Sequence, residues 1–251
     1  MRAALQPTLP PAVLDAFPDL PGVRAFFTTR TGGVSRGPWD ALNLGARCGD
    51  DPEAVRQNWG LLQDALSLPA GAPALPLLCH GIALVEAAEA EHAEADAVYT
   101  HRTGRLLAVT MADCLPALIA DPETGCVAAV HAGWRGTRDN ILGTTLQRLL
   151  AEGRIRPDTV HVALGPCLSG NALEVGEEVA ATLPQEHVLR DGARPRFDLR
   201  GCNRAQAVAA GVPGARITET GGCTHAQPGL FFSHRRDGGI TGRMAACILL
   251  T

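Results

Sequence analysis

The sequence predicts a single α/β domain with α+β character, in which mixed β-sheets are covered by helices. Short apolar runs rich in β-branched residues, each bounded by turn residues, predict buried strands. Amphipathic segments lie among these runs without strict β-α-β alternation. No repeat divides the 251 residues, and the Pro/Gly/Ala stretch at 69–76 is too short to separate two domains. We therefore expect one layered domain spanning residues 1–251.

The first half of the chain contains three predicted strands and one predicted helix. Residues 23–28 form an apolar strand followed by a Gly-rich turn. The sequence Asp50-Asp51-Pro52-Glu53 combines an acidic cap with a proline in the first turn, so a helix is expected from here to about residue 66. Two later apolar runs are predicted as buried strands: residues 106–110 and 126–131.

The second half begins with a predicted helix over residues 138–151. Its apolar side chains share one face, as expected for a helix packed on a sheet: Leu142, Leu146, Leu149 and Leu150. The remaining predicted elements are strands at 160–164, 215–220 and 244–250, and short helices at 174–183 and 203–210.

The basic residues exclude several mechanisms. All 22 residues counted as Lys plus Arg are arginines, which excludes a Walker-type phosphate loop and Schiff-base chemistry, because both need a lysine. Anions must instead be bound by guanidinium groups, which grip carboxylate or phosphate through paired hydrogen bonds. The formal net charge of −4 predicts neither nucleic acid nor an anionic membrane as a partner.

The cysteine content and the N-terminus bear on localisation. Eight cysteines in 251 residues fall below the density of a disulfide scaffold, so the thiols are expected to be free or metal-bound. Residues 1–7 lack the apolar run of a secretory signal, and no stretch approaches the roughly 18 apolar residues of a membrane span. We expect a cytoplasmic protein.

Three potential metal ligands each lie where a buried segment meets a turn. His80 follows an apolar Leu-Leu pair, Cys114 follows a predicted strand, and His131 ends another. Two imidazoles and one thiolate would leave a fourth tetrahedral position open, which is typical of a catalytic zinc site. A metal ion there would activate water or polarise a substrate oxygen. The gaps of 34 and 17 residues match no compact zinc signature, so spacing alone leaves other interpretations open.

Other interpretations use the same residues differently. The histidines are also compatible with hydrogen-bonded structural residues, and the cysteine with a small apolar one. A Cys114 thiolate with His131 as its base would make a cysteine hydrolase, with Asp113 or Asn43 orienting the imidazole. A third possibility is a non-catalytic protein that binds purines or another protein.

Several motifs in order resemble a known family. They are Thr29-Arg30-Thr31-Gly32-Gly33-Val34-Ser35, Leu42-Asn43-Leu44-Gly45, Gly49-Asp50-Asp51-Pro52, Thr110-Met111-Ala112-Asp113-Cys114-Leu115-Pro116, Val130-His131-Ala132-Gly133-Trp134-Arg135-Gly136, Leu164-Gly165-Pro166-Cys167, Glu174-Val175-Gly176-Glu177-Glu178-Val179 and Phe231-Phe232-Ser233-His234-Arg235-Arg236-Asp237-Gly238. Over residues 20–250 the chain resembles the YfiH-type family, also called the laccase-domain or polyphenol-oxidase family.

The resemblance implies a YfiH-like α/β domain with a zinc ion held by His80, Cys114 and His131. It implies phosphorolysis of adenosine, inosine and methylthioadenosine, with adenosine deamination beside it, so a purine nucleoside and phosphate are the expected partners. It also implies a link to peptidoglycan editing and an older description as a copper polyphenol oxidase. One His₂Cys set can hold one copper ion, but the eight histidines include no His-x-His pair, so laccase chemistry is the weakest enzyme hypothesis.

The chain departs from the family pattern beside the first ligand. Leu78-Cys79 stands where the family has Gln-Val before the His-Gly pair. Because adjacent residues of an extended segment point to opposite faces, Cys79 is not expected to join the site. The segment 169–173 also lacks the family's second cysteine and aromatic residue, which predicts altered packing there.

Three more residues complete the predicted site. Asp113 is expected to shuttle a proton during deamination. Arg135, at a turn before a helix, is expected to hold phosphate with help from amide groups at the helix start, with Arg30 and Arg47 as second-line candidates. Asn43 is expected to contact the ribose or the purine through its amide.

Overall fold

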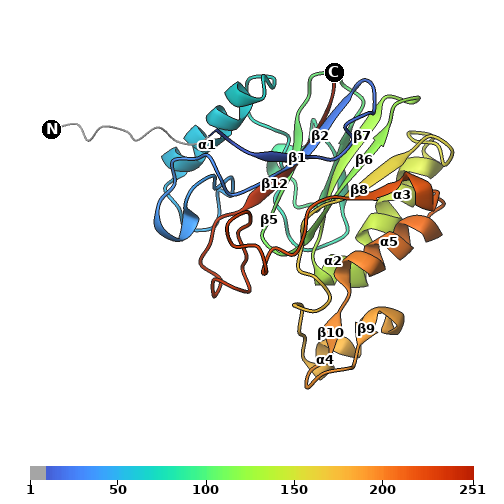
Figure 1. The fold of residues 1–251 in the computed structure, drawn as a ribbon. Coiled ribbons are helices and arrows are strands. Elements are labelled where there is room, and N and C mark those ends of the chain that lie inside the picture. Colours follow the sequence, from blue (N-terminus) through green and yellow to red (C-terminus); the bar gives the residue numbers. More distant parts are fainter. Residues whose placement is uncertain (1–9) are drawn as a thin grey trace.

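The computed structural model describes residues 10–251 as two β-sheets packed face to face with helices outside them (Figure 1). The first sheet is antiparallel and has four strands, in the order β1 (Val13–Asp15), β2 (Val23–Thr28), β12 (Met244–Leu250) and β5 (Leu107–Met111). The chain's last strand is therefore central in this sheet, and it joins β2 to β5.

The second sheet is mixed. One of its strands contains His131, and another begins directly after Cys114. Its order is β11 (Ile217–Glu219), β8 (His161–Leu164), β6 (Leu115–Asp121), β7 (Cys126–Ala132), β4 (Ala97–Thr100) and β3 (Leu84–Glu86). The central strands pair antiparallel, whereas the two edge strands pair parallel with their neighbours. A separate two-stranded ribbon joins β9 (Val188–Leu189) and β10 (Arg196–Phe197).

The three longest helices lie on the outer faces of the two sheets. The α-helices are α1 (Pro52–Ala65), α2 (Trp134–Arg138), α3 (Ile141–Ala151), α4 (Glu177–Ala180) and α5 (Leu199–Ala209), and short 3₁₀ turns occupy Gly37–Trp39, Ala90–His92, Gln185–His187 and Gly214–Arg216. Helices α3 and α5 cover the six-stranded sheet, and α1 lies beside the four-stranded one (Figure 1). Asp51 caps α1 by accepting a hydrogen bond from the Glu53 amide at 3.0 Å.

Alternation along the strands distributes the apolar side chains among three cores. In β6, Leu115, Ala117 and Ile119 pack toward α3 and α5, whereas Leu118 and Ala120 pack against the four-stranded sheet. A third cluster, which includes Phe26 and Cys247, lies between the four-stranded sheet and α1. Burial on both faces keeps the strands of the central layers rigid, so that turns at their ends can hold functional groups in place.

Several predicted elements are confirmed, one begins later than predicted, and one is largely wrong. The strands at 23–28 and 244–250 and the helix after Asp51 form as predicted. The predicted helix 138–151 forms as α3 but begins at Ile141 rather than Arg138, because Asn140 adopts a left-handed conformation (φ 66°) that separates it from the short helix α2. Only Glu177–Ala180 of the predicted helix 174–183 is helical, because Glu174 pairs with Arg196 in an isolated β-bridge.

Among the described residues, no helix is both long enough and apolar enough to cross a bilayer. The part of the domain prediction that covers residues 1–9, including the expected absence of a signal sequence, lies outside the described residues.

Candidate metal centre and active-site pocket

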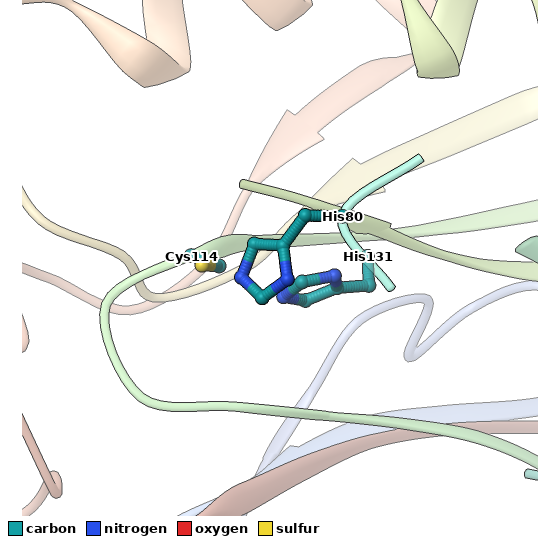
Figure 2. A group of neighbouring side chains, drawn as sticks. All are labelled: His80, Cys114 and His131. Atoms are coloured by element: carbon teal, nitrogen blue, oxygen red, sulfur yellow. The ribbon is translucent and has the colours of Figure 1, made fainter. Parts of the chain in front are cut away.

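The three predicted ligands come together from three separate segments. His131 belongs to β7, Cys114 lies in the turn between β5 and β6, and His80 lies in the loop before β3. Their ligand atoms all lie within 4.8 Å of one another, and Figure 2 shows the sulfur and the two imidazoles facing a common point. The imidazole planes are perpendicular, with ring centroids 5.0 Å apart. The structure therefore brings the three predicted residues into one group that could hold a metal ion.

A buried carboxylate, Asp96, holds both histidines. Its Oδ1 accepts hydrogen bonds from the His131 Nδ1 at 2.8 Å and from the His80 amide at 3.0 Å. Its Oδ2 accepts from the amides of Gly81 at 2.7 Å and Cys79 at 3.2 Å. The bond to Nδ1 leaves Nε2 of His131 for a metal, which is the usual carboxylate–histidine–metal arrangement. Asp96 therefore fixes one ring directly and the His80 loop through its backbone.

Asp96 is the functional residue that sequence analysis missed. It directly precedes the buried strand β4 and has no exposed surface. The only signal in the sequence is a single carboxylate inside the apolar run Ala95-Asp96-Ala97-Val98, since a buried charge needs partners.

Gly133 allows the ligands to approach β7. A Cβ atom at this position would lie 2.9 Å from Cδ2 of His80 and 3.2 Å from Sγ of Cys114. Its φ of −73° is ordinary for any residue, so the requirement for glycine is steric rather than conformational.

The charges of the site favour a thiolate. Burial raises the pKa of the Cys114 thiol, but the charge and hydrogen bonds of His131 and the hydrogen bond of His80 outweigh it and hold the pKa at about 6. Burial likewise opposes protonation of His131, yet the neighbouring Cys114 and Asp96 raise its pKa to about 10. Burial opposes ionisation of Asp96, but its hydrogen bond to His131 holds the pKa at about 2. The shifts in pKa together favour a thiolate on Cys114 beside a protonated His131.

The donor set fits a soft or borderline metal cation. A cation takes the place of the imidazolium proton and satisfies the thiolate, while Asp96 keeps the imidazole oriented. Two imidazoles and a thiolate suit zinc, and they also suit copper. In residues 10–251 this is the one group of three side chains that could hold a metal.

The three ligands line a cavity of about 600 Å³. This volume falls in the range of ordinary small-molecule sites. Part of the wall is apolar and includes Leu75, Leu78 and Met111, whereas four arginines contribute the basic groups: Arg47, Arg135, Arg235 and Arg243. The cavity therefore combines an apolar wall with a positive rim.

Arg135 lies at this rim on α2, with its guanidinium 4.4 Å from the Trp134 ring. Within residues 10–251 neither Arg135 nor Arg47 forms an ion pair. The helix that carries Arg135 has only five residues, so its amides add little dipole of their own. Arg30, by contrast, lies outside the pocket lining, where it bonds to the Asp40 carbonyl and packs 4.6 Å from the Phe232 ring.

Asp113 lines the pocket beside Cys114 and is nearly buried. Its Oδ1 accepts a hydrogen bond from the Thr224 hydroxyl at 2.6 Å, and its Oδ2 accepts from the Arg235 amide at 2.6 Å. Each oxygen retains a second acceptor site. The carboxylate is thus fixed in place by two other segments of the chain.

The structure does not bring Asn43 into the pocket. Asn43 has no exposed surface, and its Oδ1 accepts from the amides of Gly45 at 3.0 Å and Arg243 at 2.8 Å. Its Nδ2 donates to Asp50 Oδ2 at 2.9 Å. Both Gly45 and Arg243 line the pocket, so Asn43 positions the wall from behind.

The other cysteines described below do not join the three-ligand group. Cys79 is outside the three-ligand group, and its thiol donates to Asp96 Oδ2 at 3.2 Å. Four others are buried as small apolar side chains: Cys126, Cys167, Cys202 and Cys247.

The fold and the site define a class: a layered α/β protein in which a His-Cys-His metal-site candidate lines a pocket. A family model described as multi-copper polyphenol oxidoreductase laccase matches residues 24–251. The chain belongs to this family, the YfiH-type laccase-domain family.

Named relatives are similar over nearly the whole chain. It is 42% identical to a purine nucleoside phosphorylase of Deinococcus radiodurans over 242 residues, which cover 92% of this chain and 93% of the relative. It is 33% identical to the adenosine deaminase RL5 of an unknown prokaryotic organism, covering 92% and 95%. The crystal structure of the Bacillus licheniformis hypothetical protein YfiH superposes with a TM-score of 0.87 at 27% identity, covering 99% and 98%.

Proposed function

We propose that this protein is a zinc-dependent purine nucleoside phosphorylase that acts on adenosine, inosine and methylthioadenosine, with adenosine deamination as a side activity. The observation that carries the proposal is the juxtaposition, in one cavity of about 600 Å³, of the three-ligand group and of arginines without ion-pair partners among the described residues. The names of the relatives, a purine nucleoside phosphorylase and an adenosine deaminase, point to the same chemistry.

Phosphorolysis needs a bound phosphate beside the glycosidic bond. Arg135 binds phosphate in this proposal, and Arg47 assists from another segment of the lining, because within residues 10–251 neither has a carboxylate partner. Arginine binds phosphate oxygens through two parallel hydrogen bonds, which orients the anion as well as holding it. The phosphate oxygen then attacks the sugar carbon as the carbon–nitrogen bond breaks, and the purine leaves with the bonding electrons.

The apolar wall binds the purine, and Asp113 moves the proton. Leu75, Leu78 and Met111 offer a surface on which a flat base is shielded from water. Asp113 exchanges protons with the purine during deamination through its remaining acceptor sites, while Thr224 and Arg235 keep it oriented. Asn43 holds the segment before Arg47 in position, and it acts on the nucleoside through that segment. When bound, the zinc ion supplies Lewis acidity to the reaction.

The products formed from adenosine test the proposal. Adenosine is incubated with the zinc-loaded protein, with and without phosphate, and the products are separated by chromatography. Adenine together with ribose 1-phosphate, formed only with phosphate, demonstrates phosphorolysis, and inosine demonstrates deamination. Unchanged adenosine under both conditions would exclude both activities.

A cysteine hydrolase is the second candidate, because Cys114, His131 and Asp96 form a thiolate, imidazole and carboxylate series. The orienting carboxylate in this series is Asp96, whereas the sequence predicts Asp113 or Asn43 in that role. His80 shares the same sulfur, which supports metal binding over a free nucleophile. Chelation distinguishes the two: it abolishes activity that depends on a metal, whereas a cysteine hydrolase survives it and is inactivated by alkylation.

A further inference from the structure

A second cysteine-containing site lies beside the pocket wall, on two of the three segments that hydrogen-bond to Asp113. Cys167 follows β8, and Cys223 follows β11 by a few residues. The two are partners in an isolated parallel β-bridge, and both line a separate cavity of about 150 Å³. Bridge partners on neighbouring extended segments lie about 4.8 Å apart, which is within the Cα–Cα range of about 4.4–6.8 Å found in disulfides.

We propose that Cys167 and Cys223 form a dithiol that a hydroperoxide oxidises to a reversible disulfide, with Cys223 as the residue attacked first. Two cysteines alone make a poor metal site, and the one three-ligand group in residues 10–251 is the His80 group. A reducing compartment keeps such a pair as thiols, and a disulfide formed there is transient.

The surroundings of the two sulfurs assign their roles. Cys223 is half-buried, and its sulfur accepts a hydrogen bond from the Ser169 amide at 3.4 Å. Partial burial opposes ionisation, but Ser169 and the amides of His225 and Ala226 lower the pKa of Cys223 below its ordinary value. Cys167 has no exposed surface, and burial raises its pKa to about 12. Cys223 is therefore the accessible nucleophile, and Cys167 is the resolving thiol beside it.

The reaction balances with hydrogen peroxide as the oxidant. The Cys223 thiolate attacks one peroxide oxygen, so that a sulfur–oxygen bond forms, the oxygen–oxygen bond breaks, and the leaving hydroxide takes a proton from solvent. Cys167 then loses its proton to solvent and attacks the sulfenic sulfur. The sulfur–sulfur bond forms as the second hydroxide leaves and is protonated to water. Two thiols lose two hydrogens, and one peroxide becomes two waters.

Arg200 supports the second step. It lines the same cavity, and its hydrogen bond and positive charge favour the Cys167 thiolate against the effect of burial on the pKa of that thiol. Its Nη2 donates to the Gly165 carbonyl at 3.0 Å, which fixes the guanidinium beside the segment that carries Cys167.

The disulfide would join two of the segments that hydrogen-bond to Asp113, those of Leu168 and Thr224. Leu168, next to Cys167, donates its amide to the Asp113 carbonyl at 2.9 Å. Thr224, next to Cys223, donates its hydroxyl to the Asp113 carboxylate and its amide to the Cys167 carbonyl at 3.0 Å. The residue after each cysteine, Leu168 or Thr224, therefore hydrogen-bonds directly to Asp113 in the pocket wall.

The test uses the folded, metal-loaded full-length protein. It is reduced, freed of reductant and treated with hydrogen peroxide while folded. Its remaining thiols are then alkylated in denaturant, and the digest is mapped by mass spectrometry without reduction. We expect a linked peptide pair containing Cys167 and Cys223 that dithiothreitol separates. Cys223→Ser should abolish the link and leave Cys167 alkylated, and Cys167→Ala should leave a sulfenic acid on Cys223 that dimedone traps.

Cys48 provides the matched control. It is also half-buried, and its sulfur accepts from the Asn43 Nδ2 at 3.2 Å, but its thiol donates to the Gly45 carbonyl at 3.1 Å, whereas no carbonyl acceptor is found for the Cys223 thiol among the described residues. Cys223 should be oxidised faster than Cys48, and Cys48→Ser should leave the link intact. The proposal is overturned if the folded wild type yields no such link, or if Cys48 is oxidised as fast as Cys223. Should Cys167→Ala fail to fold, the wild type and Cys223→Ser still decide the matter.

Discussion

Replacing Asp96 by Asn tests whether this buried carboxylate builds the metal centre. The carboxylate accepts from the His131 ring and from three consecutive amides, at residues 79–81. The side-chain amide introduced by Asp96→Asn would keep one acceptor oxygen and present a donor in place of the other. In either orientation, at least one of the N–H groups would then face another donor.

The size of the effect follows from these contacts. Each hydrogen bond to a charged group contributes about 1.5–3 kcal/mol, and changing a partner that orients a metal ligand typically weakens metal binding about 10- to 100-fold. We expect Asp96→Asn to weaken zinc affinity in this range, because the change loosens His131 directly and the His80 loop through its backbone. Competition between the protein and a chromophoric chelator measures the affinity.

Asp121→Asn is the matched control for this substitution. Asp121 is equally buried at the end of β6, and its oxygens accept from the amides of Glu123 and Arg156 and from the Thr159 hydroxyl. The substitution Asp121→Asn should lower the free energy of unfolding while leaving zinc affinity unchanged. Wild-type zinc affinity in Asp96→Asn, or an equal loss of affinity in both variants, would refute the reasoning.

Three further substitutions separate the parts of the site. Gly133→Ala should weaken zinc binding about tenfold or more, because the added Cβ would lie 2.9 Å from the His80 ring. Gly60→Ala is the control and should leave zinc binding unchanged, because its added Cβ would have no atom within 4 Å. The chelator competition measures both affinities. Arg135→Gln should lower kcat/KM for phosphate about 10- to 100-fold in phosphorolysis assays. Arg138→Gln is the control: it removes only a partly exposed ion pair with Asp139 and should change kcat/KM little. Equal losses in the two variants would contradict the phosphate-binding role of Arg135. Cys79→Ala should retain zinc and turnover, and loss of the metal by elemental analysis would show that this thiol is a ligand.

The sequence predicts the parts of the fold that are governed by local pattern. The strand β12 is a continuous apolar run, β2 is apolar except for Arg24 and Thr28, and α1 has its cap and proline, so their positions need no tertiary information. The pattern does not predict the central strand β6, because Pro116 near its start is unusual in a central strand. It fits here because its carbonyl accepts from the Gly165 amide at 2.9 Å and its missing N–H lies at the beginning of the strand.

Tertiary contacts decide the elements that sequence analysis misplaced. The segment around Glu174 has helical character, but the Val175 amide bonds to the Pro195 carbonyl at 3.0 Å and draws the segment toward the β9–β10 ribbon. The spacing of the three metal ligands along the chain matches no metal-binding signature. They could be predicted as one group only because the motifs around them resemble those of the family. Asp96 and the buried position of Asn43 depend on loop packing, which leaves no periodic trace in the sequence.

Titration of zinc into the metal-free protein, with ribose 1-phosphate formation from adenosine and phosphate as the readout, tests the central claim most directly. The account predicts that turnover rises in proportion to bound zinc and saturates at about one ion per chain, and that Cys114→Ala neither binds the ion nor turns over. Full phosphorolysis by the metal-free protein, or by Cys114→Ala, would contradict it.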